Sequence, residues 1–181
     1  MMTKDLFIKK LQDIQNNHKT VYMRGVYGAP VTEDIISYKT DQYPNWYSSE
    51  RQITLRNLIG KGFFGFDCVC LIKGVLWGWN GDDTQEYGGA EYESNGVPDI
   101  NADTMITKCE EVTEDFSKIE AGEALWCNGH IGVYIGDGKA VECTSRWSSN
   151  VQVTAVGNIG TVEGLNTRVW IKHGKLPYIM Y

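Results

Sequence analysis

The sequence lacks several features that would assign it at once to a familiar class of protein. It has no run of the roughly 20 apolar residues that a membrane-spanning helix needs. Its N-terminal segment has neither the apolar core nor the small-residue cleavage site of a secretory signal. Acidic residues (23) outnumber Lys and Arg (17), and no basic patch is visible, which argues against nucleic-acid binding. We therefore expect a protein made in the cytoplasm, with no membrane span and no nucleic-acid partner.

Proline, low-complexity sequence and patterned cysteine are also scarce. Four prolines and the absence of a repetitive tract exclude a disordered chain. The five cysteines are an odd number, and their spacings match no zinc or thioredoxin motif, so we expect free thiols and no metal or organic cofactor. The chain has 181 residues, of which 42% are hydrophobic, and this is enough for one domain, which we place at residues 1–181.

The first half of the sequence has the patterns of helices and loops. Residues 4–16 carry apolar side chains at helical spacing, contributed by Leu6, Phe7, Leu11 and Ile14. Residues 18–50 contain several Gly and Pro residues and predict irregular structure before a short helix at 51–59. The almost wholly apolar stretch after Asp67 favours a buried helix with Asp67 as its N-cap. Residues 80–107 are acidic and predict a solvated loop.

From residue 121 the pattern changes to short segments rich in Val, Ile, Tyr and Trp, separated by Gly, Asn-Gly or Asp-Gly. The segments that predict strands are GEALW, HIGVYIG, KAVECT, VQVTAV and TRVWIKH. The second and third are joined across Asp137-Gly138, a pair that is typical of a two-residue hairpin turn. Helices followed by an antiparallel sheet predict the α+β fold class.

Cys68 differs from the other cysteines because it begins the predicted apolar helix, directly after a segment rich in Gly and Phe. The unpaired N–H groups and the dipole at a helix start stabilise a thiolate, which is the reactive form of cysteine. Cys70 lies two residues further on and points to a different side of the helix. We therefore predict Cys68, and not Cys70, as a nucleophile.

Only three histidines are present, and their surroundings differ. His130 follows an Asn-Gly pair and opens an apolar strand, a position from which a sheet presents a side chain to a cleft. His18, in a polar turn, and His173, near the C-terminus, are predicted to be exposed or incidental. An imidazole beside a thiol acts as a general base, so His130 is the predicted partner of Cys68.

Two segments together resemble a known family. GFDCVCLIKGVLW resembles the nucleophile motif of the NlpC-type family of papain-like cell-wall peptidases, and GEALWCNGHIGVYIGDGKAVECT resembles the second motif of that family. The order also agrees: Cys at a helix start, then His at a strand start, then a polar residue on the next strand. The resemblance implies a papain-like fold, in which N-terminal helices and the nucleophile helix pack on an antiparallel sheet.

The resemblance assigns the third catalytic position to Glu142. This residue lies on the strand after the Asp-Gly hairpin, close enough to His130 to orient the imidazole by a hydrogen bond. A carboxylate there stabilises the imidazolium and so favours a thiolate–imidazolium pair. Asn128 is the alternative third residue.

The resemblance also points to residues around the nucleophile. The backbone N–H of Cys68 would be one oxyanion donor. Tyr22, in the stretch TVYMRGVYG, matches the tyrosine that supplies a second donor in the family, and Tyr27 is the fallback. Asp67 is interpreted as an N-cap first and as a substrate contact second. Trp126 is interpreted as a cleft residue because it lies shortly before the predicted histidine.

The activity that the resemblance implies is hydrolysis of an amide bond in or next to the stem peptide of bacterial peptidoglycan. The enzyme would be an endopeptidase or an N-acetylmuramoyl-L-alanine amidase, and its partner would be the stem peptide. The sequence has no secretion signal and no wall-binding module, which fits the catalytic domain of a bacteriophage endolysin. Such a domain reaches the wall after release or delivery, and its wall-binding domain would be separate or removed.

Three other functions stay open at this stage. A secreted amidase effector would have a similar site. A catalytically inactive wall-binding or structural module would share the fold, but the joint presence of Cys68, His130 and Glu142 argues against it. A cytoplasmic thiol enzyme that acts on other substrates is the third alternative.

Overall fold

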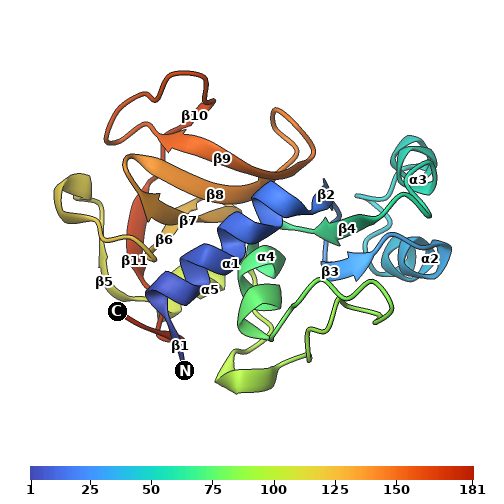
Figure 1. The fold of residues 1–181 in the computed structure, drawn as a ribbon. Coiled ribbons are helices and arrows are strands. Elements are labelled where there is room, and N and C mark those ends of the chain that lie inside the picture. The colour runs from blue at the N-terminus through green and yellow to red at the C-terminus, as the bar shows by residue number, and fades with distance from the viewer.

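A computed structural model describes residues 1–181 as a mixture of helices and strands (Figure 1). The α-helices are α1 (Lys4–Asn17), α2 (Glu33–Gln42), α3 (Ser49–Arg56), α4 (Cys68–Leu76) and α5 (Ala102–Lys108). Two short 3₁₀ helices lie at Ser94–Gly96 and Phe116–Lys118. The strands are β1 (Met2–Thr3), β2 (Lys19–Tyr22), β3 (Tyr27–Pro30), β4 (Phe63–Phe66), β5 (Glu110–Thr113), β6 (Ala124–Cys127), β7 (His130–Gly136), β8 (Lys139–Thr144), β9 (Asn150–Val156), β10 (Thr167–Arg168), β11 (Lys172–Lys175) and β12 (Ile179–Met180).

A curled seven-stranded sheet, in the order β10-β9-β8-β7-β6-β11-β5, forms the larger layer. Its pairs are antiparallel except for the β9–β10 pair at one edge. Helix α4 packs against β7 and β8 and contacts α1 and α5, which also contact the large sheet directly (Figure 1). A second sheet, β2-β4-β3, lies beside it, and its central strand β4 leads into α4. The short β1–β12 pair brings the two ends of the chain together.

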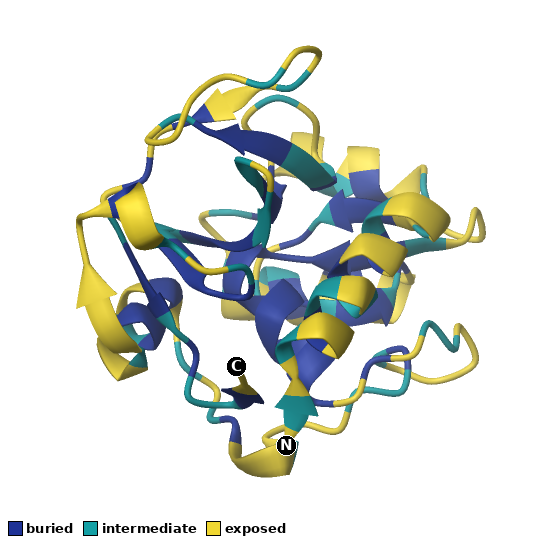
Figure 2. Ribbon diagram, turned by 60° about the vertical axis from the view of Figure 1, so that its left-hand side comes forward, coloured by how far each residue is buried: buried dark blue, intermediate teal, exposed yellow.

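The main hydrophobic core lies between the helices and one face of the large sheet. It joins the buried face of α1 to α4 and to inward-facing strand residues such as Val133 and Val141. Tyr134 and Ala140, their neighbours along the same strands, belong to a smaller cluster on the opposite face. In Figure 2 the central strands are almost entirely buried, whereas the helix that follows the N-terminus is mixed in colour. The middle of the sheet is therefore buried on both faces.

Several elements predicted from the sequence are confirmed. Helix α1 occurs where apolar spacing predicted a helix over 4–16, α3 overlaps the short helix predicted at 51–59, and the stretch after Asp67 forms α4. Strands β6 to β9 occupy the predicted segments. Asp137 (φ 51°) and Gly138 (φ 69°) both adopt the left-handed conformation that a type I′ hairpin turn needs. The chain therefore has the predicted order, with most helices before the large antiparallel-containing sheet.

Other predictions are wrong, and each failure has a tertiary cause. Residues 18–50 are not irregular, because β2 and β3 both pair with the distant β4, and α2 follows them. Residues 80–107 are not all loop, since α5 begins at Ala102. The single strand predicted over 167–173 is split into β10 and β11, which pair with different neighbours. Leu6 was expected on the buried face of the first helix but is 45% exposed.

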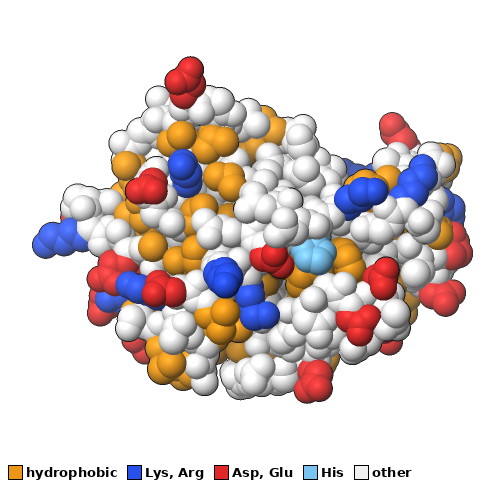
Figure 3. Space-filling model, viewed as in Figure 1, with side chains coloured by type: hydrophobic (Ala, Val, Ile, Leu, Met, Phe, Trp, Pro, Cys, Tyr) orange, Lys and Arg blue, Asp and Glu red, His pale blue; other side chains and the backbone are white.

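The surface carries charges of both signs. On the face viewed in Figure 3, Lys and Arg side chains alternate with Asp and Glu, and no large area has a single sign. None of the helices has the length and hydrophobicity that crossing a membrane requires.

Candidate active site

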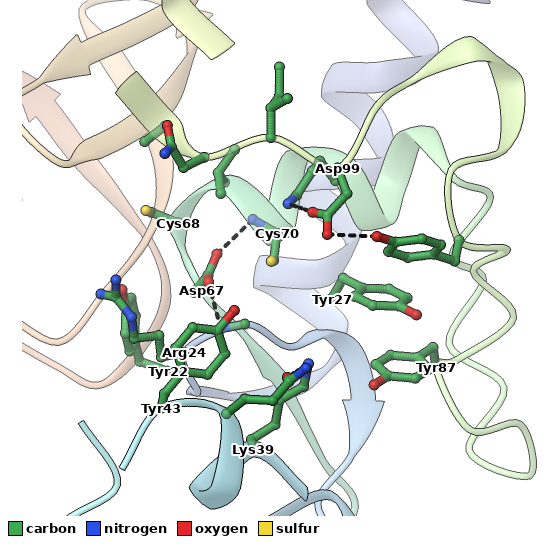
Figure 4. Close-up of a pocket in the computed structure, with 18 of the residues that line it drawn as sticks. Tyr22, Arg24, Tyr27, Lys39, Tyr43, Asp67, Cys68, Cys70, Tyr87 and Asp99 are labelled. Atoms are coloured by element: carbon green, nitrogen blue, oxygen red, sulfur yellow. Dashed lines mark hydrogen bonds and ion pairs between the residues drawn. The ribbon is translucent and has the colours of Figure 1, made fainter. Parts of the chain in front are cut away.

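Cys68 is the first residue of α4, as predicted, and it lines a cavity (Figure 4). Strand β4 leads into this helix through Asp67. The Asp67 carboxylate accepts two backbone N–H bonds, from Cys70 and from Gly25, each 2.7 Å long. The first bond is the predicted N-cap, and the second ties the helix start to the turn before β3. The position of Cys68 is therefore set by backbone hydrogen bonds at the strand-to-helix junction.

The buried setting of Cys68 changes its acidity. Burial, together with the Asp67 carboxylate, raises the pKa of the Cys68 thiol to about 12. The backbone N–H groups of Ile131, Val69 and Cys68 itself act in the opposite direction. The helix start therefore favours the thiolate as predicted, but desolvation outweighs it, and the expected low pKa is wrong. At neutral pH Cys68 is a thiol that needs a base at the moment of attack.

The negative charge of Asp67 can be tested separately from its capping role. Asp67→Asn should lower the pKa of Cys68, because the charge that opposes the thiolate is removed. One of the two backbone bonds is lost, at a cost of about 1 kcal/mol in unfolding free energy. The measurement is the rate of Cys68 alkylation against pH, followed by mass spectrometry of the peptide that carries it. An unchanged pH profile in a folded variant would show that this charge does not act on the thiol.

His130 and Glu142 form the predicted pair. His130 opens β7, Glu142 lies on the adjacent β8, and His130 Nε2 is 2.6 Å from Oε2 of Glu142. Glu142 is fully buried, so it is not an ordinary exposed strand residue. A carboxylate only accepts hydrogen bonds, and this places the imidazole proton on Nε2. Nδ1 makes no hydrogen bond within the protein and keeps a basic lone pair.

The residues on either side of His130 approach Cys68, although His130 itself does not line the cavity. Strand β7 pairs with β6 from His130 onward, and Ile131 and Val133 pack in the main core with α4. Gly129, which precedes His130, lines the same cavity as Cys68. The N–H of Ile131, which follows His130, stabilises the Cys68 thiolate. Cys68 is thus bordered by the residues on both sides of His130.

Glu142 is held by two further residues that sequence reasoning missed. Arg168 Nε donates to both carboxylate oxygens of Glu142, at 3.0 and 2.8 Å, and the Thr154 hydroxyl donates to Oε1 at 2.6 Å. Burial by itself would raise the pKa of Glu142, but the bonds from His130 and Arg168 outweigh it and hold the pKa below its ordinary value. Glu142 is therefore ionised at neutral pH, and its charge is shared between the imidazole and a buried guanidinium.

Trp170 and Gly132 complete the support of the imidazole. The Trp170 ring stacks on His130, with centroids 5.5 Å apart and planes 12° apart. A Cβ added at Gly132 would lie 2.9 Å from the Trp170 ring and 3.2 Å from Cβ of Glu142. Only glycine at position 132 allows both side chains to approach the histidine this closely.

Gly132→Ala should therefore disturb the imidazole without touching the nucleophile. The added methyl group must displace Trp170 or Glu142, which we expect to cost about 1–3 kcal/mol in stability. Misplacement of the imidazole should lower the rate constant kcat at least about tenfold. Gly160→Ala is the matched control, because no atom lies within 4 Å of a Cβ added there. Equal activity of the two variants would contradict the role given to Gly132.

The cavity beside Cys68 has a volume of about 650 Å³ and a polar aromatic lining (Figure 4). Six tyrosines contribute to it: Tyr22, Tyr27, Tyr38, Tyr43, Tyr87 and Tyr92. Its charged residues are Arg24, Lys39, Lys73, Asp67, Asp99 and Glu86. Four of these tyrosines and charged residues come from the acidic segment 80–107, which was predicted to be a solvated loop: Glu86, Tyr87, Tyr92 and Asp99. That segment instead forms one wall of the cavity.

The remaining predicted residues lie in different places. Tyr22 lines the cavity, and its pKa is raised by burial and then by the nearby Cys68. Tyr27 also lines it but stacks on Tyr87, with centroids 3.8 Å apart. Trp126 does not line it, since its Nε1 donates to Asp103 outside the cavity at 2.9 Å. Of the two tyrosines, Tyr22 is therefore the one that lies near Cys68. Asn128 is exposed, in the turn before β7.

The prediction that the other two histidines are exposed or incidental is wrong for His173. His173 is buried, Nδ1 is hydrogen-bonded to Glu123, and Nε2 lies 2.9 Å from the carbonyl oxygen of Asp115. This pair belongs to β11 and the residues before β6, and neither residue lines the cavity. His18 is half-buried and packs edge-on against Trp79.

A comparison with protein-family profiles and a search of curated protein sequences found no match to this chain. No three His, Cys, Asp or Glu side chains converge in a way that would hold a metal ion. The chemistry of the site is therefore argued from its own geometry.

Proposed function

We propose that this protein is a cysteine hydrolase of papain-like architecture that cleaves an amide bond in or next to the peptidoglycan stem peptide. The observation that carries the proposal is the orientation of His130. Its Nε2 is held by a buried, ionised Glu142, and its Nδ1 is left without a partner beside the residues that border Cys68. That arrangement gives a thiol the base it needs, and the two sequence motifs around these residues suggest the family and the substrate.

The reaction begins with a neutral thiol. Nδ1 of His130 takes the Cys68 proton as Sγ attacks the amide carbonyl, so that a C–S bond forms and the carbonyl oxygen becomes negative. On this proposal the backbone N–H of Cys68 and the Tyr22 hydroxyl stabilise that oxygen. The C–N bond then breaks, and the amine leaves with the proton held by His130. Water, activated by the same imidazole, hydrolyses the thioester and regenerates the thiol.

Glu142 keeps the base in its productive form throughout this cycle. It fixes the proton on Nε2 and stabilises the imidazolium that forms when Nδ1 takes the thiol proton. Arg168 shares the carboxylate, so the negative charge of Glu142 is not directed to His130 alone. This favours proton transfer during attack over a thiolate–imidazolium pair that exists before substrate binds, in agreement with the raised pKa of Cys68.

The experiment that tests the proposal is digestion of purified sacculi, with mass spectrometry of the released fragments. The mass of the new termini names the bond: a free muramoyl carboxylate means amidase, and a cut within the stem means endopeptidase. On this proposal the protein meets its substrate after release or delivery to the wall. The proposal would be overturned if sacculi from several wall types stayed undigested by protein whose Cys68 thiol is shown by titration to be free.

A further inference from the structure

Two buried lysines line the cavity beside Cys68, and only one has a counter-ion. Lys73 forms an ion pair with Asp99, which also accepts the Tyr92 hydroxyl at 2.9 Å. Lys39, on α2, is 6% exposed and lies within 4 Å of no carboxylate. Its ammonium group donates only to the neutral side-chain amide of Gln42, at 2.9 Å. A buried ammonium without an anion is unfavourable, so this arrangement needs an explanation.

The carboxylates nearest in the cavity are already engaged. Both oxygens of Asp67 accept backbone N–H groups, and Asp99 is shared between Lys73 and a tyrosine. Glu86, at the rim, is exposed. No carboxylate of the protein pairs directly with Lys39, although the charges of Asp67 and Asp99 partly offset the burial that lowers the pKa of its ammonium group. An anion that enters the cavity would be the first to pair with it directly.

A second cation lies on the same side of the cavity. Arg24 has no carboxylate partner, and its guanidinium lies 5.5 Å from the centre of the Tyr43 ring. Tyr43 follows α2 directly and its N–H bonds to the carbonyl of Lys39. In Figure 4, Arg24, Tyr43 and Lys39 form one side of the cavity, opposite Cys70 and Asp99. Two cations without counter-ions, with a tyrosine between them, thus face the space next to the nucleophile.

We propose that Lys39, assisted by Arg24 and Tyr43, binds a carboxylate group of the substrate in the cavity beside Cys68. The inference rests on the proposed function for the identity of the substrate, a peptide with a free carboxylate near the bond that is cut. A singly charged carboxylate fits this cavity better than a phosphate, because the carboxylates of Asp67 and Asp99 also line it and repel a doubly charged anion more strongly. The ammonium supplies a charge-assisted hydrogen bond that a carboxamide cannot match.

The test measures binding in the Cys68→Ala variant, so that nothing is cleaved. Two peptides are compared. One is L-Ala-γ-D-Glu-L-Lys, and the other is the same peptide with the α-carboxylate of its D-Glu residue converted to an amide. We expect the carboxylate form to bind about tenfold more tightly, and Lys39→Met in the same background to abolish that preference. Lys9→Met is the control, since Lys9 is an exposed cation on α1 outside the cavity. An unchanged preference in the Lys39 variant would overturn the assignment.

A second measurement does not depend on peptidoglycan. Acetate should shift the NMR amide resonances of α2 around Lys39 in the otherwise unmodified protein, and acetamide should not. Acetate binding without hydrolysis of sacculi would mean that the carboxylate site stands and the proposed function fails. No acetate effect at α2, or stronger binding of inorganic phosphate, would overturn the carboxylate site whatever the wall activity.

The folding of the variant is itself informative. Methionine keeps the apolar stem of Lys39 and removes a buried charge, so Lys39→Met should unfold at a temperature no lower than the unmodified protein. A marked loss of stability would show that the ammonium serves the fold and not a ligand. Arg24→Met, at an exposed position, should reduce the carboxylate preference only in part.

Discussion

Cys68→Ala should abolish hydrolysis of peptidoglycan, with a fall in kcat of at least about 10⁴-fold, while the protein stays folded. The side chain lost is the nucleophile, whereas the backbone N–H of residue 68 and the Asp67 cap both remain. The measurement is release of soluble fragments from sacculi, with thermal unfolding of both proteins as the check on folding. Removal of one small buried side chain should cost about 1 kcal/mol in stability.

Cys70→Ala is the matched control. Cys70 lies two residues further along α4, is equally buried and lines the same cavity. Its role in the N-cap is played by its backbone N–H, which alanine retains. We expect most of the activity to survive. Equal loss in both variants would show that the thiols matter only for packing, and full activity of Cys68→Ala would place the nucleophile elsewhere.

Glu142→Gln should lower kcat by about 10³- to 10⁴-fold, more than the loss of one charge alone would suggest. The reason is Arg168, whose Nε needs an acceptor and donates to both oxygens of Glu142. A glutamine side chain has only one oxygen. Because Arg168 can only donate, that oxygen accepts from Arg168, and the side-chain NH₂ group then faces His130. Nε2 must then accept, the imidazole proton moves to Nδ1, and the lone pair that receives the Cys68 proton is lost.

The chain contains its own control for this variant. His173 and Glu123 form a second buried imidazole–carboxylate pair in the same sheet, and neither residue lines the cavity. Glu123→Gln should therefore reduce stability to a similar extent but leave kcat within about threefold of the unmodified value. NMR of the imidazole nitrogens of His130 would detect the change of tautomer. Equal activity of the two variants would mean that Glu142 only stabilises the sheet.

Glu142→Ala tests the structural cost of the same group. It leaves the Arg168 guanidinium buried without an anion, which should cost about 3–5 kcal/mol in unfolding free energy.

Acidification should also reduce the stability of the protein through Glu142. The pKa of Glu142 lies below its ordinary value in the folded state, so the stability that this group contributes is present above pH 4.5 and is lost as pH falls through the folded-state pKa. The loss on acidification should be smaller in Glu142→Gln.

Local features of the sequence were sufficient to predict much of this protein. The apolar run after a capping Asp67 predicted α4 and the position of Cys68, and the Asp-Gly pair predicted the hairpin that brings Glu142 within hydrogen-bond distance of His130. These predictions succeeded because caps, turns and strand alternation depend on neighbours in the chain. The α+β order followed from the same local patterns.

Only the tertiary structure decided the electrostatics of the site. The partners of Glu142 are Thr154 and Arg168, which lie on other strands, and no local pattern connects them to it. The pKa of Cys68 depends on how completely the cavity wall removes water, which overrode the helix start that the sequence revealed. Lys39 lies in a stretch that was predicted to be irregular, and only the packing of α2 buries this lysine in the cavity lining. Desolvation and long-range ion pairing depend on which distant segments meet, and chain order alone does not specify that.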